Sequence, residues 1–118
     1  MKGQIKTQGL RTAVLLFFSF LLIFGGCSEN SSERTPKTHV IQIRSMKFNP
    51  SSIFVHKGDT VKWINKDIVQ HEITNDNDHA WTSGPLKKDQ EWTTVVEENL
   101  HYFCSIHVVM KGRVTVEK

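Results

Sequence analysis

The chain has 118 residues, which is enough for one domain of ordinary size and too few for several. Its net charge is +3 at pH 7, and this basic excess lies at the N-terminus, in Lys2, Lys6 and Arg11. The rest of the chain has twelve basic and twelve acidic residues, so its charge gives no reason to expect nucleic-acid binding.

Residues 1–26 have the composition of a secretory signal. A basic start is followed by an uncharged apolar run from Thr12 to Phe24, and Gly25 and Gly26 close the segment with small residues. The apolar run is shorter than the ~20 residues that a membrane-spanning helix needs. We therefore expect an export signal rather than a transmembrane anchor.

The segment L-I-F-G-G-C, which ends at Cys27, resembles the cleavage box of bacterial lipoproteins, with Phe24 where such boxes usually carry Leu. In lipoproteins this cysteine becomes the lipidated first residue of the mature chain. We expect lipidation at Cys27, and hence an exported protein of the periplasm or another extracytoplasmic space, held at a membrane only by its lipid. The alternative is an ordinary signal cleaved nearby, which would leave Cys27 as a free thiol or as the disulfide partner of Cys104.

Residues 27–38 are polar, contain Pro36 and lack large apolar side chains, which predicts a flexible tether. A flexible segment of about 11 residues has a typical end-to-end distance on the order of 20 Å. The folded domain is then expected to occupy residues 39–118.

Short segments in which apolar and polar residues alternate predict β-strands along residues 39–118. The alternating pairs are Ile41 with Ile43, Ile53 with Val55, Val61 with Trp63, and Val114 with Val116, and residues 92–96 and 102–104 add β-branched and aromatic segments. Clusters of Gly, Asn and Asp separate these segments, and no segment has a sustained helical period. The pattern predicts an all-β fold, an antiparallel sandwich of seven to eight short strands.

The chemistry of the chain is concentrated in residues 100–112, which read L-H-Y-F-C-S-I-H-V-V-M-K-G. Cys104, His107 and Met110 offer a thiolate, an imidazole and a thioether at intervals of three residues. Thiolate and thioether are soft donors, a set that suits copper better than calcium or magnesium. A blue copper site takes two His, one Cys and a weak axial Met, so one His is missing here. We expect His71, on another strand, to supply it.

The segment M-K-F-N-P-S-S-I-F-V-H-K-G-D-T-V-K-W-I-N-K-D, followed by His71 and then by C-x-x-H-x-x-M, closely resembles the small cupredoxins, the type 1 blue copper proteins. The likeness runs from about Val40 to Val116, and the short ligand loop is most similar to that of the amicyanins, with the plastocyanins next. It implies a Greek-key β-sandwich with one copper ion that cycles between Cu(II) and Cu(I). The ligands that it implies are His71, Cys104, His107 and Met110.

The resemblance also implies an electron carrier that exchanges single electrons with redox partner proteins. In cupredoxins the loop histidine lies near the surface among apolar residues where partners dock, which here implies a docking patch of Ile106, Val108 and Val109. The residue after the first histidine is commonly Asn in the family, and Glu72 stands there in this chain. We expect the Glu72 side chain to contact Ser105 or a nearby backbone amide, and we expect the protein to be a monomer.

Other interpretations of the ligand pattern belong to different functional classes. Zinc is the main rival metal because Cys and His bind it well, but Met110 would be a poor zinc ligand. A copper-binding lipoprotein that buffers or delivers the ion would need the same ligands as an electron carrier. A metal-free sandwich used for adhesion would leave the C-x-x-H-x-x-M spacing as a coincidence. We expect no enzyme, because the sequence has neither a nucleophile elbow nor a Gly-rich phosphate loop.

Overall fold

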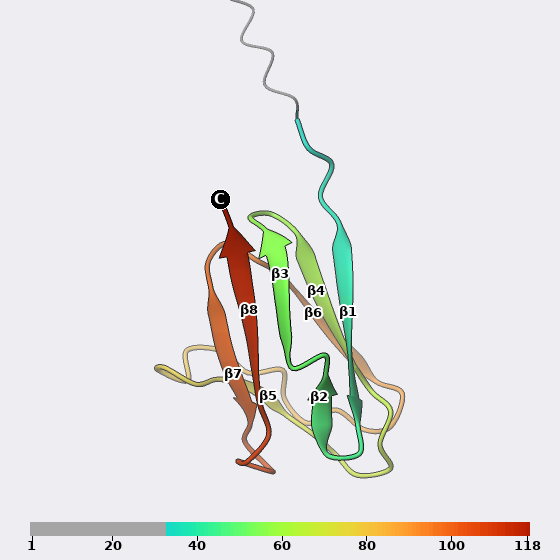
Figure 1. The fold of residues 1–118 in the computed structure, drawn as a ribbon. Helices are drawn as coiled ribbons and strands as arrows, with labels where there is room; N and C mark the ends of the chain where they lie inside the picture. Colours follow the sequence, from blue (N-terminus) through green and yellow to red (C-terminus); the bar gives the residue numbers. More distant parts are fainter. Residues whose placement is uncertain (1–32) are drawn as a thin grey trace, which may run out of the picture. The chain divides into compact units, whose positions relative to one another are not determined.

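Eight β-strands and no helix are present in residues 33–118, the part of the chain that this computed structural model describes (Figure 1). The strands are β1 (Thr38–Arg44), β2 (Lys47–Asn49), β3 (Ser52–His56), β4 (Thr60–Asn65), β5 (Ile73–Asn75), β6 (Glu91–Val95), β7 (Leu100–Cys104) and β8 (Lys111–Glu117). Within the described residues, no helix is long and apolar enough to cross a membrane. The expected signal segment, residues 1–26, and the expected lipidation site Cys27 lie outside the described residues.

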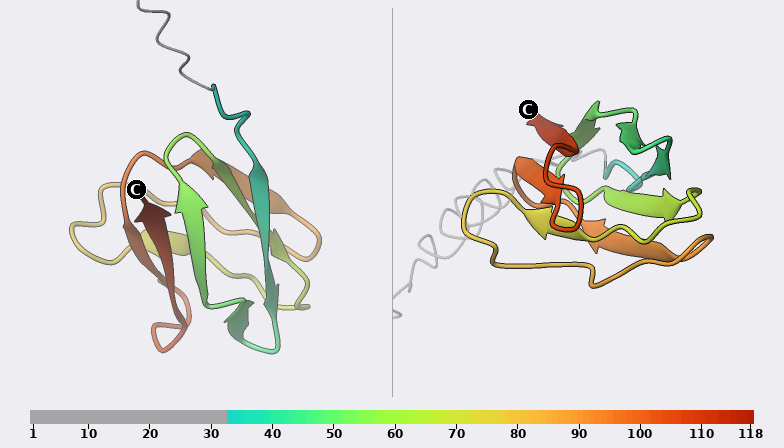
Figure 2. Two further views of the ribbon diagram at one scale, coloured as in Figure 1. Left: turned by 45° about the horizontal axis from the view of Figure 1, so that its top comes forward. Right: turned by 90° about the horizontal axis from the view of Figure 1, so that it is seen from below.

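The strands form two four-stranded sheets, with the orders β2-β1-β4-β6 and β3-β8-β7-β5. Figures 1 and 2 show them as two layers of a sandwich, so the predicted all-β sandwich of seven to eight short strands is confirmed. Antiparallel pairing was predicted, but β1 pairs with β4, and β3 with β8, in parallel. The reason is that β3 and β4 lie in different sheets, so the turn at residues 57–59 carries the chain across the sandwich instead of closing a hairpin.

The core lies between the two sheets and is built from the alternating positions of the strands. Ile41 and Ile43 of β1 and Val61 and Trp63 of β4 are completely buried, as their alternation predicts. In the other sheet the buried apolar residues are Val55 of β3, Ile73 of β5, Leu100, Tyr102 and Cys104 of β7, and Val114 of β8. Burial of one such aliphatic side chain contributes about 1.5–3 kcal/mol, so this core holds in place the strands from which the ligand loop extends.

The N-terminal end of the domain is fixed by a buried carboxylate, Asp59, in the turn between β3 and β4. Arg34 donates hydrogen bonds to both carboxylate oxygens over 2.7–2.8 Å, and the amide of Lys37 donates a further one over 2.8 Å. The Lys37 amide, together with His39, the His56 amide and Arg34, holds the pKa of Asp59 well below its usual range in spite of burial. Arg34 and Lys37, at the end of the predicted tether, therefore contact the domain.

Gly112 allows β7 and β8 to approach closely around a large side chain. It lies directly opposite Tyr102 in the antiparallel pair, and a Cβ atom at this position would overlap the Tyr102 ring. The Gly112 backbone does not adopt the left-handed conformation that favours glycine, so the requirement comes from the ring and not from the backbone.

The substitution Gly112→Ala is expected to destabilise the domain by about 1–3 kcal/mol, because the added methyl group overpacks the core against Tyr102. Denaturant unfolding of both proteins measures this change. In a Tyr102→Leu background the same glycine substitution should cost much less, since the obstructing ring is gone. Equal costs in the two backgrounds would show that the ring is not the cause.

Candidate metal centre

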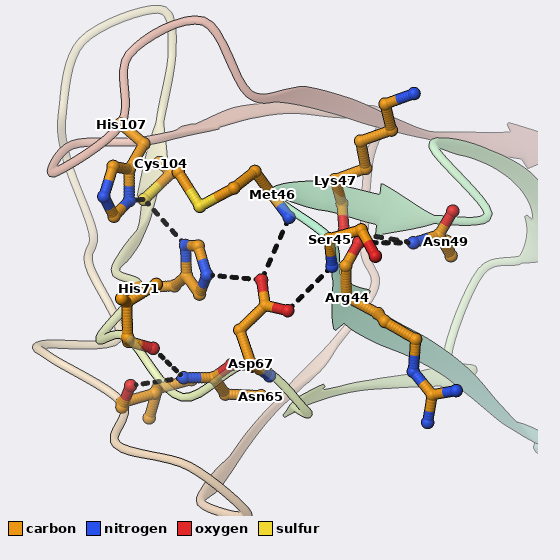
Figure 3. Close-up of polar contacts among 12 residues, drawn as sticks. Arg44, Ser45, Met46, Lys47, Asn49, Asn65, Asp67, His71, Cys104 and His107 are labelled. Atoms are coloured by element: carbon orange, nitrogen blue, oxygen red, sulfur yellow. Dashed lines mark hydrogen bonds and ion pairs between the residues drawn. The ribbon is translucent and has the colours of Figure 1, made fainter.

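Three potential ligands that are distant in the sequence meet at one end of the sandwich. His71 precedes β5, Cys104 is the last residue of β7, and His107 lies in the loop between β7 and β8. The Cys104 Sγ atom is 3.7 Å from the Nδ1 atom of His71 and 3.7 Å from the Nδ1 atom of His107 (Figure 3). Candidate ligand atoms of all three residues lie within 4.8 Å of one another.

These separations suit a single metal ion. A sulfur about 2.3 Å and a nitrogen about 2.05 Å from the same ion lie about 3.6–3.8 Å apart at tetrahedral or trigonal angles. Both sulfur to nitrogen distances fall in that interval. Cys104 is a free and completely buried cysteine, so its sulfur is available as a ligand.

Met110 closes the loop that carries Cys104 and His107. Its carbonyl oxygen accepts a hydrogen bond from the Cys104 amide over 3.0 Å, and its amide donates one to the His107 carbonyl over 2.9 Å. The residue is buried, and β8 begins immediately after it. The loop of residues 104–110 is therefore closed by its own backbone, which limits the positions that its side chains can adopt.

Asp67 orients His71 through the ring nitrogen that faces away from Cys104. The Asp67 Oδ2 atom lies 2.9 Å from the Nε2 atom of His71 (Figure 3). Burial disfavours the charged carboxylate, but the amides of Met46 and Ser45 and the His71 ring outweigh it and lower the pKa of Asp67. An ionised carboxylate only accepts hydrogen bonds, so Nε2 is the protonated nitrogen and Nδ1 keeps its lone pair free for a metal.

Asn65 holds the backbone around the same histidine. Its buried side-chain amide donates to the carbonyl oxygens of Val69 and Leu86, both over 2.8 Å, and its Oδ1 atom accepts from the Asp67 amide over 2.9 Å. Leu86 also exchanges both backbone hydrogen bonds with His71. The segment that leads from β4 to His71 is thus fixed on both sides.

These supporting residues were missed by reasoning from the sequence. In the sequence, Asn65 and Asp67 belong to one of the clusters of Asn and Asp that separate the predicted strands, and nothing there assigns them a role at the site. The available signal was the position of Asp67 four residues before His71. That signal is weak, because in a loop such spacing does not determine which side chains meet.

Glu72 joins the His71 segment to the ligand loop through its backbone. Its amide approaches the Cys104 Sγ atom at 3.5 Å, and its carbonyl oxygen accepts from the Ser105 amide over 3.1 Å. Its side chain was expected to reach Ser105 or a backbone amide. The carboxylate instead accepts a hydrogen bond from the Thr82 hydroxyl over 2.7 Å, and the bridge between Thr74 and Thr82 holds that residue nearby.

The three residues predicted as a docking patch are all exposed around the partly buried His107. Val109 is 88% exposed and Val108 61%, and Ile106 is exposed as well. Ile68 and Val69, in the segment between β4 and His71, are further exposed apolar residues that the sequence interpretation did not single out. Exposed apolar side chains that gather on one surface are typical of interaction sites.

The donor set itself distinguishes between metals. His71, Cys104 and His107 form the one group of His, Cys, Asp and Glu side chains within residues 33–118 that is arranged to hold a metal ion. A structural zinc site would have a fourth Cys or His ligand in addition to these three. One thiolate, two imidazoles and a neighbouring methionine correspond instead to the donors of blue copper sites.

Comparison with known proteins agrees with this donor set. A model of copper-binding proteins of the plastocyanin/azurin family matches residues 36–117. Amicyanin of Paracoccus denitrificans is 33% identical over 84 residues, which cover 66% of this chain and 64% of that relative. Amicyanin of Paracoccus versutus is 29% identical over 84 residues, which again cover 66% of this chain and 64% of that relative. The chain therefore matches slightly less than two thirds of the length of these relatives.

Solved structures of similar fold include an amicyanin variant in its Cu(I) form, with a TM-score of 0.64 and 29% sequence identity. That match covers 68% of this chain and 82% of the other. The copper-containing nitrite reductase of Thermus scotoductus SA-01 matches with a TM-score of 0.61 and 22% identity over 73% of this chain and 23% of the enzyme, which shows a shared fold only. The predicted cupredoxin fold is confirmed.

The substitution Asp67→Ala is expected to lower the affinity for copper by about 10- to 100-fold, because the His71 ring loses the partner that fixes its orientation and tautomer. Competition with a chelator of known affinity measures the loss. The control Glu91→Ala removes an exposed carboxylate that pairs with Lys62 and should leave the affinity unchanged. An Asp67→Ala protein that binds copper as tightly as the parent would contradict this role.

Proposed function

This chain belongs to the plastocyanin/azurin family of copper-binding proteins, and we propose from that premise that it carries single electrons between partner proteins. The observation that supports the proposal is the convergence of one thiol and two imidazoles, from segments distant in the sequence, within 4.8 Å. A copper ion bound there supplies a one-electron couple between Cu(II) and Cu(I).

We assign the ligands to the Nδ1 atoms of His71 and His107, the Sγ atom of Cys104, and the sulfur of Met110 as a weak axial donor. The two 3.7 Å separations support the first three. Met110 is assigned from its place in the C-x-x-H-x-x-M motif and from its burial at the end of the same loop.

The residues around the cluster favour fast electron transfer because they restrict movement of the ligands. Asp67 and the backbone of Leu86 hold His71, and the hydrogen bonds of Met110 hold the loop. A site whose ligands keep the same positions in both oxidation states needs little rearrangement when an electron arrives or leaves. The Glu72 amide, at 3.5 Å, can stabilise negative charge on the Cys104 sulfur and so influence the reduction potential.

Electrons would enter and leave through His107, the one assigned ligand that is partly exposed and not buried. Ile106, Val108 and Val109 surround it with exposed apolar surface on which a partner protein can exclude water. Such a small patch suits brief encounters, since weak electron-transfer complexes lie at the low end of interface sizes. The donor and acceptor would thus be redox proteins that a monomer meets in turn, and we propose a carrier rather than an enzyme.

The proposed location is outside the cytoplasm, periplasmic or surface-exposed. The signal-like residues 1–26 and the expected lipidation of Cys27 support it, with the polar residues between Cys27 and Arg34 as the connection between lipid and domain. Membrane contact would then depend on the lipid alone.

The visible spectrum of the protein with added Cu(II) tests the site directly. One equivalent of copper should produce an intense blue absorption from charge transfer between the Cys104 thiolate and the ion. The substitution Cys104→Ser should abolish the colour, whereas His101→Ala, an exposed histidine of the same strand, should keep it. Colourless cupric protein would refute the electron carrier, and ready transfer of copper to a metal-free acceptor protein would indicate delivery of the ion instead.

The substitution Val108→Asp is expected to slow electron self-exchange at least about tenfold, the equivalent of about 1.4 kcal/mol, while the blue colour remains. Self-exchange requires two molecules to meet through their docking patches. The two new carboxylates would then lie close together in a poorly hydrated contact and repel each other. Line broadening in NMR spectra of mixed oxidation states measures the rate. The matched control is Val95→Asp, an equally drastic change at an exposed position on β6. Similar rates for all three proteins would exclude the patch as the contact surface.

A further inference from the structure

Four aromatic side chains form a continuous row of neighbouring rings that leads from the surface to the core. This aromatic file consists of Trp81, Trp92, Trp63 and Tyr102. The rings of Trp81 and Trp92 are stacked with centroids 5.3 Å apart, and Trp92 lies 5.3 Å from Trp63. Trp63 in turn meets the edge of Tyr102 at 5.2 Å. The sequence has three Trp and one Tyr, so this file contains every aromatic side chain of the protein that can readily lose an electron.

The fold explains how the file is assembled. Trp63 and Trp92 are direct partners in the antiparallel pair of β4 and β6, so their rings lie on the same face of the sheet. β6 is the edge strand of that sheet, and Trp81 lies in the connection between β5 and β6. The Trp81 carbonyl accepts a hydrogen bond from the amide of Asn75, the last residue of β5, which fixes its position beside the other sheet.

The exposure of the rings changes along the file. Trp81 and Trp92 are partly exposed, whereas Trp63 and Tyr102 are completely buried. Tyr102 lies two residues before Cys104 on the same face of β7, and side chains so spaced on a strand are about 7 Å apart. The file therefore begins in solvent at Trp81 and ends one side chain from the sulfur of the metal cluster.

We propose that this file is a second electron route, by which a strong one-electron oxidant at the surface is reduced at the expense of the metal site. The oxidant removes one electron from Trp81. The Trp81 radical cation then takes an electron from Trp92, oxidised Trp92 takes one from Trp63, and oxidised Trp63 takes one from the site that holds Cu(I). The net change is one electron lost at the site and one gained by the oxidant, with no proton released. The inference rests on the copper site proposed above and adds to it a route separate from His107.

The surroundings of Trp63 and Tyr102 favour transfer of the positive charge to the next donor over loss of a proton, which would trap the charge as a neutral radical. Trp63 Nε1 and Tyr102 Oη are buried and have no hydrogen-bond partner within residues 33–118. Without a base beside it, oxidised Trp63 keeps its proton and remains a strong oxidant that takes an electron from the next donor. Tyr102 also lacks a proton acceptor, so it acts as a bridge between Trp63 and Cys104 and is not itself oxidised.

The experiment uses the full protein loaded with Cu(I) and two oxidants that differ in strength. Photogenerated tris(bipyridine)ruthenium(III) can oxidise indole, whereas ferricyanide cannot and must react at the exposed edge of His107. With the ruthenium oxidant we expect a rapid phase of blue colour formation, preceded by the transient absorption of a tryptophan radical. Trp81→Phe and Trp92→Phe, which keep an aromatic ring but are far harder to oxidise, should both lose this phase.

The ferricyanide reaction is the internal control and should proceed at the same rate in the parent and in both variants. A second measurement uses metal-free protein, where the tryptophan radical should form as before but persist, because no Cu(I) is present to refill it. The inference is overturned if the rapid phase survives in both variants, or if the radical decays equally fast without copper. Failure to develop any blue colour with either oxidant would instead refute the copper site itself.

Discussion

The approach of the His71 imidazole to the Cys104 thiol, inside the protein and at 3.7 Å, is the contact on which the rest of the site depends. Two polar groups are removed from water there, which is unfavourable unless each finds partners. Asp67 supplies one for the ring, and the Glu72 amide supplies one for the sulfur. The pairing of Ile73 with Cys104 between β5 and β7 then fixes the distance, so the sheet itself determines the spacing of the donors.

The features that were predictable from the sequence are those recorded in local patterns. The alternation of Val61 and Trp63 identified an inward face, and the spacing of Cys104, His107 and Met110 predicted the loop that brings Cys104 and His107 into the candidate metal cluster. The parallel pairing of β1 with β4 was not predictable in this way, because it depends on the sheet to which each strand belongs. The role of Asp67 was missed for a similar reason: its partners Ser45 and Met46 lie in the turn between β1 and β2, and no local pattern connects them with it.

The aromatic core combines a packing function with an energetic cost. A buried donor or acceptor without a partner costs about 1–3 kcal/mol, and both Trp63 and Tyr102 have such an atom. A side chain without a polar atom would avoid that cost at either position. The close approach of Gly112 shows how completely the neighbouring strand is adapted to the Tyr102 ring. Oxidisable rings at these positions are easier to understand if their electronic properties are used as well as their volume.

The ion pair between Arg34 and the buried Asp59 also fixes where the chain enters the domain. β8 runs from Lys111, beside the ligand loop, to Glu117, which is paired with His56 near Asp59, and its seven residues span about 20 Å. The Arg34 contact and the tip around His107 therefore lie at opposite poles, as the ends of β8 do in Figure 1. Residues 34–37 are therefore remote from His107, and they leave the exposed apolar surface around that histidine uncovered.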